Sequence, residues 1–144
     1  PAVEVVQCKT VEELVKNSEI ICTTTPATSP VLPNDKELLR GKCIIAIGSY
    51  TPQMREIPDA IWDLVDKVYI ELPYACEESG DLSQPLAEGR LKEEQTVLMN
   101  EFLASGADAG ADEGKTVYYK SVGMGLFDVC IAQKILEMAK ERLA

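Results

Sequence analysis

Three short polar segments contain the residues whose types and spacing best suit them to bind a ligand, and each follows an apolar run. Residues 23–30, TTTPATSP, carry hydroxyl groups that could hydrogen-bond to ribose or base edges. In residues 47–52, IGSYTP, Gly48 would let a flat ligand approach the backbone, and Tyr50 could stack or donate a proton. In residues 120–125, KSVGMG, the backbone amides and the serine hydroxyl could hold an amide or a phosphate group.

Each segment also has a purely structural interpretation, and spacing alone leaves both open. The first two are typical of turns, where hydroxyl groups and proline shape the backbone. The Gly-x-Gly of the third is equally typical of close packing between a helix and a strand. No GxGxxG motif occurs in the chain, so a conventional dinucleotide phosphate loop is missing from it.

The absence of histidine narrows the chemistry that the chain can perform. It removes the usual general base, the Ser-His and Cys-His nucleophiles and the commonest zinc ligand. Chemistry must therefore come from carboxylates, lysine, tyrosine or a bound cofactor, and we expect no metal site. No CxxC pair occurs, and we interpret the five cysteines as reduced core residues: Cys8, Cys22, Cys43, Cys76 and Cys130.

The overall charge and hydropathy exclude several classes of partner. A net charge of −10 repels nucleic acid and anionic membrane surfaces, and no local basic patch offsets it. No apolar run is long enough to span a membrane, and no cationic segment marks a signal peptide. We expect one soluble, cytoplasmic domain. We interpret five acidic residues as solvated faces or helix starts rather than an acid-base pair: Glu77, Glu78, Asp81, Glu93 and Glu94.

The elements that must position the three segments alternate between strands and helices. Strands are predicted at Val3–Cys8, Glu19–Thr25, Cys43–Ile47, Lys67–Leu72 and Thr116–Lys120. Helices are predicted after an N-cap at Thr10 and at Pro58–Val65, Lys92–Ala104 and Gly123–Leu143, with a mobile loop at Ser105–Gly114. The strands at Glu19–Thr25 and Cys43–Ile47 look apolar enough to be buried on both faces. This alternation indicates an α/β fold with a doubly wound, mostly parallel sheet.

Taken together and in order, four segments resemble the ornithine cyclodeaminase and mu-crystallin family: TTTPATSPVL, KCIIAIGSYTPQMREI, ESGDL and KTVYYKSVGMGLFD. The resemblance runs from about Glu19 to Lys140. It implies that residues 1–144 are part of a Rossmann-like domain that binds NAD or NADP and lacks its N-terminal phosphate-loop portion. The substrate and dimerisation domain would be mostly absent, and the full-length protein would be a homodimer. Since the chain begins at Pro1 rather than methionine, we expect a processed or truncated product.

The family resemblance assigns positions to residues that the polar segments already single out. It implies that Thr25 lies by the adenosine side of the cofactor. It further implies that Ile47, Gly48, Ser49 and Tyr50 line the cofactor crevice and that Ser121 and Val122 approach the nicotinamide and the substrate. This agrees with the general rule that ligands of open parallel sheets bind beyond the carboxyl ends of the strands.

Two departures from the family pattern bear on the activity. Tyr50 stands where cyclodeaminases and related alanine dehydrogenases carry a proton-exchanging aspartate, and Met54 stands where cyclodeaminases carry a lysine. A phenol is protonated and a thioether is uncharged at neutral pH, so neither can replace those groups. The resemblance therefore implies an oxidoreductase acting on an amino or imino (ketimine) acid, with Tyr50 as a candidate proton donor, rather than an ornithine cyclodeaminase. The alternatives are a non-catalytic nicotinamide-nucleotide-binding protein of the mu-crystallin kind and, more remotely, an independent interaction module.

Overall fold

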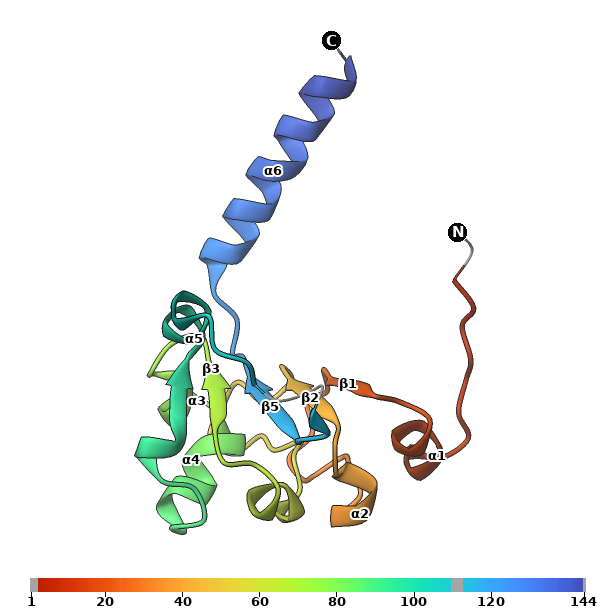
Figure 1. The fold of residues 1–144 in the computed structure, drawn as a ribbon, viewed down its shortest axis with the longest axis vertical. Helices are drawn as coiled ribbons and strands as arrows, with labels where there is room; N and C mark the ends of the chain where they lie inside the picture. Colours follow the sequence, from red (N-terminus) through yellow and green to blue (C-terminus); the bar gives the residue numbers. More distant parts are fainter. Residues whose placement is uncertain (1–2, 110–112, 144) are drawn as a thin grey trace.

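The computed structural model describes residues 3–109 and 113–143, which are organised around a five-stranded sheet (Figure 1). The strands are β1 (Ile20–Thr23), β2 (Cys43–Ala46), β3 (Val68–Ile70), β4 (Thr96–Leu98) and β5 (Val117–Lys120). The α-helices are α1 (Val11–Lys16), α2 (Lys36–Leu39), α3 (Ala75–Glu78), α4 (Gly80–Ala87), α5 (Met99–Ser105) and α6 (Gly125–Leu143). Short 3-10 helices within the described residues include η1 (Asp59–Asp63) and η2 (Glu93–Gln95).

All pairings in the sheet are parallel, and the strand order is β1-β2-β5-β3-β4. The last strand thus inserts between β2 and β3, so the chain reverses direction across the sheet after β4. Because parallel crossovers are right-handed, this reversal places α5 on the opposite face from α2, η1, α3 and α4. The sheet therefore has helices on both faces, as the doubly wound prediction requires.

The main core lies between the sheet and the first group of helices. One cluster of buried side chains joins strand residues such as Ile44 and Tyr118 to Leu39 of α2, Ile61 of η1 and Leu82 of α4. The other face holds a smaller contact, in which the Tyr69 and Phe102 rings lie 4.7 Å apart between β3 and α5. The larger core fixes the relative positions of β1, β2, β5 and β3, whose carboxyl ends meet at one edge.

Most of the predicted strands are confirmed, and the helix after Thr10 begins as expected. The Thr10 hydroxyl accepts a hydrogen bond from the backbone N–H of Glu13, which satisfies one free donor of α1. The predicted helix at Pro58–Val65 is present as the 3-10 helix η1, and the terminal helix is α6. The strand predicted at Val3–Cys8 is wrong because the segment pairs with no other strand, and Val3, Val5 and Val6 are exposed.

The helix predicted at Lys92–Ala104 is also wrong over its first half. Residues 93–95 form η2, Thr96–Leu98 form β4, and helical geometry begins only at Met99. Thr96 and Val97 are β-branched, and pairing with Val68 and Tyr69 of β3 outweighs the helical spacing that Leu98 and Phe102 suggest. Of the loop predicted at Ser105–Gly114, Ser105 belongs to α5, and residues 110–112 lie outside the described part of the chain.

Burial of the strands differs from the prediction on one face of the sheet. Exposed and buried residues alternate along β1, and Ile20 is 64% exposed. The cysteines follow the same pattern, because none is fully buried: Cys8, Cys43 and Cys76 are half-buried, and Cys22 and Cys130 are exposed. Cys76 packs against the core as predicted, whereas the exposed Cys22 and Cys130 contradict the prediction, and all five are free thiols.

The terminal helix α6 extends away from the sheet (Figure 1). Its apolar side chains are exposed: Leu126, Phe127, Val129, Ile131, Ile135, Leu136 and Met138. None of the helices within residues 3–109 and 113–143 is long and apolar enough to cross a membrane.

Replacing Tyr118 by phenylalanine is expected to stabilise the fold by about 1 kcal/mol, because it removes a buried hydroxyl without a hydrogen-bond partner among the described residues. The ring itself is retained, and with it the edge-to-face contact with Trp62 at 5.9 Å. Urea denaturation of the parent and of Y118F at neutral pH measures the difference in free energy of unfolding. A destabilised Y118F would show that the hydroxyl has a partner in solution.

The same substitution should also change the alkaline limit of stability. Burial raises the pKa of Tyr118 well above its ordinary value, so the folded state holds this proton more tightly than the unfolded chain. The resulting stabilisation is complete below the ordinary tyrosine pKa and is lost as the pH rises through it towards the folded pKa. Y118F should therefore lose less stability than the parent when denaturation is repeated at increasing pH above about 9.

Candidate functional site

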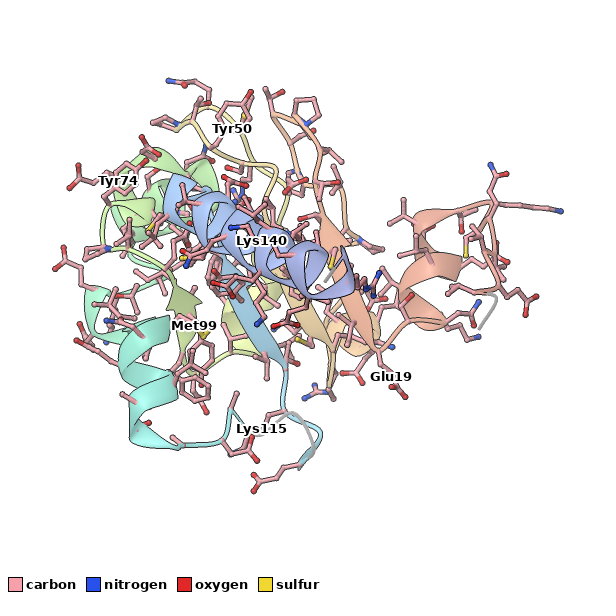
Figure 2. All side chains as sticks on the ribbon, turned by 90° about the horizontal axis from the view of Figure 1, so that it is seen from above. Glu19, Tyr50, Tyr74, Met99, Lys115 and Lys140 are labelled. Atoms are coloured by element: carbon pink, nitrogen blue, oxygen red, sulfur yellow. The ribbon has the colours of Figure 1, made fainter. Side chains whose placement is uncertain are left out.

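The loops that follow β1, β2 and β5, together with Glu71 after β3, meet at the carboxyl edge of the sheet. The strand register aligns Thr23 with Ala46, and Ala46 and Ile70 with Lys120, so the residues that follow these positions start side by side. Figure 2 shows Tyr50 at the opposite end of the sheet from Glu19 and Lys115, which precede β1 and β5. The three polar segments identified in the sequence are thus brought to one edge.

A single buried carboxylate, that of Glu56, holds the β1 and β2 loops together. Its Oε2 accepts hydrogen bonds from the Thr23 hydroxyl and the Gly48 N–H, both at 2.8 Å. Its Oε1 accepts a hydrogen bond from the Thr25 N–H at 2.6 Å. Glu56 is completely buried, and these three donors are neutral groups that compensate its desolvation. The carboxylate therefore fixes the separation of the two loops.

The close contact between the β1 and β2 loops requires a glycine at position 48. A Cβ atom at position 48 would lie 2.2 Å from the Thr25 carbonyl oxygen and 2.5 Å from Glu56 Oε1. The space beside this glycine is filled by the protein's own backbone and carboxylate, which is a different reason for glycine than the approach of a flat ligand. Gly80 has a comparable role, since its Cβ would lie 2.1 Å from the Met54 carbonyl oxygen.

A second buried network links the β2 loop to the start of α4. The Ser49 hydroxyl donates to the Met54 carbonyl at 2.7 Å and lies 2.8 Å from the Ser79 hydroxyl. Asp81 Oδ1 accepts the N–H groups of Glu56 and Ile57 at 2.7 and 3.0 Å. The Ser49 side chain is therefore directed into the protein, and only its backbone can border a ligand at this edge.

The third network surrounds Glu71, which follows β3. Glu71 Oε1 accepts hydrogen bonds from the Ser121 hydroxyl at 2.9 Å and from the N–H groups of Val122 and Gly123 at 2.6 and 3.1 Å. These amides are consequently engaged by the protein rather than free. Close packing does not explain the two glycines of KSVGMG, because a Cβ at Gly123 or Gly125 would meet nothing within 4 Å.

Lys120 and Asp81 form an ion pair beneath this edge. Their Nζ and Oδ2 atoms lie 3.5 Å apart, and both side chains are 0% exposed. Burial lowers the pKa of Lys120 and raises that of Asp81, and the mutual attraction of the pair opposes both shifts. The pair therefore forms part of the buried floor of the site, and neither group is accessible to a ligand.

The remaining candidate residues are at the surface of the same edge. Ile47 and Tyr50 keep 41% and 54% of their exposure, while Thr25 and Val122 are half-buried. The Thr25 hydroxyl accepts a 3.3 Å hydrogen bond from the Ala27 N–H, which shapes the turn after β1. Two hollows among the described residues lie elsewhere. One of about 350 Å³ is bordered by Arg40, Lys67 and Lys115 near the amino ends of the strands, and one of about 490 Å³ lies between β4, α3 and α4.

Sequence reasoning missed the groups that organise this edge, namely Glu56, Glu71 and the Lys120–Asp81 pair. Asp81 does begin a helix, as interpreted, but it is fully buried rather than solvated. The signal that could have found them is the position of Glu71 and Lys120 at the ends of apolar strands, where a charged side chain needs a partner. Glu77, Glu93 and Glu94 are exposed, and Glu78 is half-buried.

Comparison with known proteins places this arrangement in a family. Residues 2–142 match the model of the ornithine cyclodeaminase/mu-crystallin family. The chain belongs to this family. It is 38% identical over 133 residues to Delta(1)-pyrroline-2-carboxylate reductase of Bacillus cereus, covering 90% of this chain and 40% of the relative. It is 25% identical to iminosuccinate reductase of Paracoccus denitrificans, covering 91% of this chain and 40% of the relative.

Solved structures show the same fold. A probable ornithine cyclodeaminase from Bordetella pertussis superposes with a TM-score of 0.72 at 30% identity, covering 85% of this chain and 39% of the other. Thermococcus litoralis Delta(1)-pyrroline-2-carboxylate reductase, solved with NADH and L-proline, superposes with a TM-score of 0.76 at 23% identity. The match covers 94% of this chain and 42% of the other. The Rossmann-like fold is confirmed, and the chain spans about two fifths of the length of these relatives.

Proposed function

We propose that this chain forms part of the nicotinamide-dinucleotide site of a reductase that acts on an imino (ketimine) acid. The observation that carries the proposal is the convergence of three loops at one sheet edge. Hydrogen bonds to Glu56 and Glu71 hold the backbones of these loops in place. The family relatives named for reduction of pyrroline-2-carboxylate and iminosuccinate support this reaction class. The neighbours solved with NADH and NAD⁺ support NAD or NADP as the cofactor.

The residues at this edge fit a nicotinamide dinucleotide. Ile47 and Tyr50 offer exposed apolar surface to a flat ring, and the half-buried Thr25 and Val122 border the same edge. The carboxylates of Glu56 and Glu71 accept hydrogen bonds from backbone N–H and hydroxyl groups. These donors partly offset the negative charge that would otherwise repel an anionic cofactor.

In this proposal each candidate residue at the edge has a place, and the buried Ser49 contributes its backbone only. Thr25 lies by the adenosine, Ile47, Gly48, Ser49 and Tyr50 line the crevice, and Ser121 and Val122 adjoin the nicotinamide. The bound cofactor supplies hydride, and the chain orients it and excludes water. Tyr50 is the candidate proton donor because its phenol is exposed at this edge, whereas Lys120 is buried and paired with Asp81.

The complete protein is proposed to be a cytoplasmic homodimer whose substrate and dimerisation domain lies largely outside residues 1–144. The exposed apolar side chains of α6, among them Phe127, Ile131 and Ile135, support a covering partner for this helix. No nucleic acid or membrane is proposed as a partner, because the net charge of −10 opposes both.

The natural full-length protein should bind NADH or NADPH and oxidise it when Δ1-pyrroline-2-carboxylate is added. Calorimetric titration measures binding, and the loss of nicotinamide absorbance measures turnover. Binding with turnover supports the reductase. Binding without turnover of any cyclic or linear imino acid favours the alternative of a non-catalytic nucleotide-binding protein. The reason to consider that alternative is Tyr50, which stands where cyclodeaminases carry an aspartate. Absence of binding to either nucleotide overturns both.

A further inference from the structure

We propose that Glu56 and Glu71 are positioning residues for different halves of the dinucleotide site. Glu56 sets the adenosine half by holding the Thr25 backbone against Gly48 of the β2 loop, and Glu71 sets the nicotinamide half through the loop between β5 and α6. This inference rests on the proposed function, since it assigns each half of that site to its own buried carboxylate. Neither glutamate touches the ligand in this arrangement.

The two carboxylates act on different segments of the chain. All three hydrogen bonds to the Glu56 carboxylate come from the end of β1 and from the loops after β1 and β2, at Thr23, Thr25 and Gly48. All three hydrogen bonds to Glu71 come from residues 121–123, which lie between β5 and α6. Within the described residues, no hydrogen bond to one carboxylate comes from the other's loop.

The two groups are nevertheless connected through the protein beneath them. The Glu56 N–H donates to Asp81, Asp81 pairs with Lys120, and Lys120 directly precedes Ser121. The Ser121 N–H also donates to the Ala46 carbonyl at 3.0 Å. A general loss of stability would therefore weaken both halves together, whereas loss of one carboxylate should weaken one half selectively.

The hydrogen-bond pattern predicts opposite responses to glutamine. Both oxygens of Glu56 accept hydrogen bonds from backbone N–H groups, so either orientation of a glutamine amide places its NH₂ against an N–H donor. Glu71 uses only Oε1, and its buried Oε2 has no hydrogen-bond partner among the described residues. Glutamine at position 71 can therefore keep all three hydrogen bonds on its carbonyl oxygen, whereas leucine can keep none.

The experiment measures the affinities of ADP-ribose and NADH for the natural full-length protein and four variants. ADP-ribose contains the adenosine half and lacks nicotinamide, so it reports on the first half of the site alone. The variants are E56Q, E71L, E71Q and, as an exposed control, E94Q. Circular dichroism and thermal denaturation of each variant identify those that remain folded at the titration temperature.

E56Q should raise the dissociation constants of both ADP-ribose and NADH by about tenfold or more, because both contain the adenosine half. E71L should leave the ADP-ribose constant within about twofold of the parent and raise that of NADH by about tenfold. E71Q and E94Q should both resemble the parent. If E56Q is unfolded, the isosteric T23V variant replaces it and should weaken ADP-ribose binding by about threefold, since it removes one of the three hydrogen bonds.

Three results would overturn the division between the two glutamates. They are equal weakening of both ligands by E71L, unchanged ADP-ribose binding in folded E56Q or T23V, and a loss of NADH affinity in E71Q as large as that in E71L. Failure of the proposed function is distinguishable, because the parent protein would then bind neither ADP-ribose nor NADH.

Discussion

Replacement of Gly48 by alanine is expected to destabilise the fold by more than about 3 kcal/mol and to abolish dinucleotide binding. The added methyl carbon would lie 2.2 and 2.3 Å from the Thr25 carbonyl oxygen and nitrogen, and 2.5 Å from Glu56 Oε1. Two of these three contacts are with backbone, which cannot rotate away as a side chain would. Relief requires the β1 and β2 loops to separate, and this breaks the hydrogen bonds to Glu56.

Urea denaturation of G48A and its parent measures the loss of stability, and NADH titration measures the loss of binding. G125A is the matched control, because a Cβ at Gly125 meets nothing within 4 Å and the residue is the first of α6. That variant should unfold within about 0.5 kcal/mol of the parent. If G48A were as stable as G125A, the close approach of the two loops would not exist in solution.

The sequence predicts the sheet and its ligand-binding edge because those signals are local. The β-branched runs at Ile20–Thr23 and Cys43–Ala46 specify strands within four residues, and the polar segments that follow them mark the carboxyl ends. The direction of parallel strands then brings Thr25, Ile47 and Ser121 to one edge without any knowledge of the strand order. Thus the location of the candidate site follows from local patterns.

The organising carboxylates could not be predicted in the same way, because their partners are distant in the chain. Glu56 bonds to Thr23, which lies 33 residues earlier, and Glu71 bonds to Ser121, which lies 50 residues later. Only the three-dimensional packing makes a charged residue at these positions less costly than it would be elsewhere in the core.

The incorrect predictions have a related cause. Val3–Cys8 has the composition of a strand, but strand formation also requires a neighbouring strand, and none pairs with this segment within residues 3–109 and 113–143. The reverse holds at Thr96–Leu98, where pairing with β3 turns a segment of helical spacing into a strand. In both cases the tertiary partner determines the outcome, and a single sequence contains no record of that partner.

Replacement of Lys120 by methionine is expected to destabilise the fold by about 3–5 kcal/mol, because it leaves the buried Asp81 carboxylate without its compensating charge. Methionine fills a similar volume, so the loss reports mainly on the charge. In the double variant K120M/D81N no charge remains, and the asparagine oxygen can still accept the N–H groups of Glu56 and Ile57. The double variant should therefore be more stable than K120M, which a double-mutant cycle measures by urea denaturation.

The dependence on pH separates this electrostatic effect from a packing defect. Burial raises the pKa of Asp81, and without Lys120 the opposing attraction is lost, so the pKa should rise further. A folded-state pKa above the unfolded value gives stability that is present below the unfolded pKa and is lost as the pH rises through the folded one. The destabilisation of K120M relative to the parent should accordingly shrink as the pH is lowered from 8 towards about 4, close to the ordinary aspartate pKa. K120M/D81N lacks Asp81, so its own free energy of unfolding should rise less than that of K120M over the same pH range. Equal pH dependence in both variants would mean that Asp81 carries no buried charge and that Lys120 contributes through packing alone.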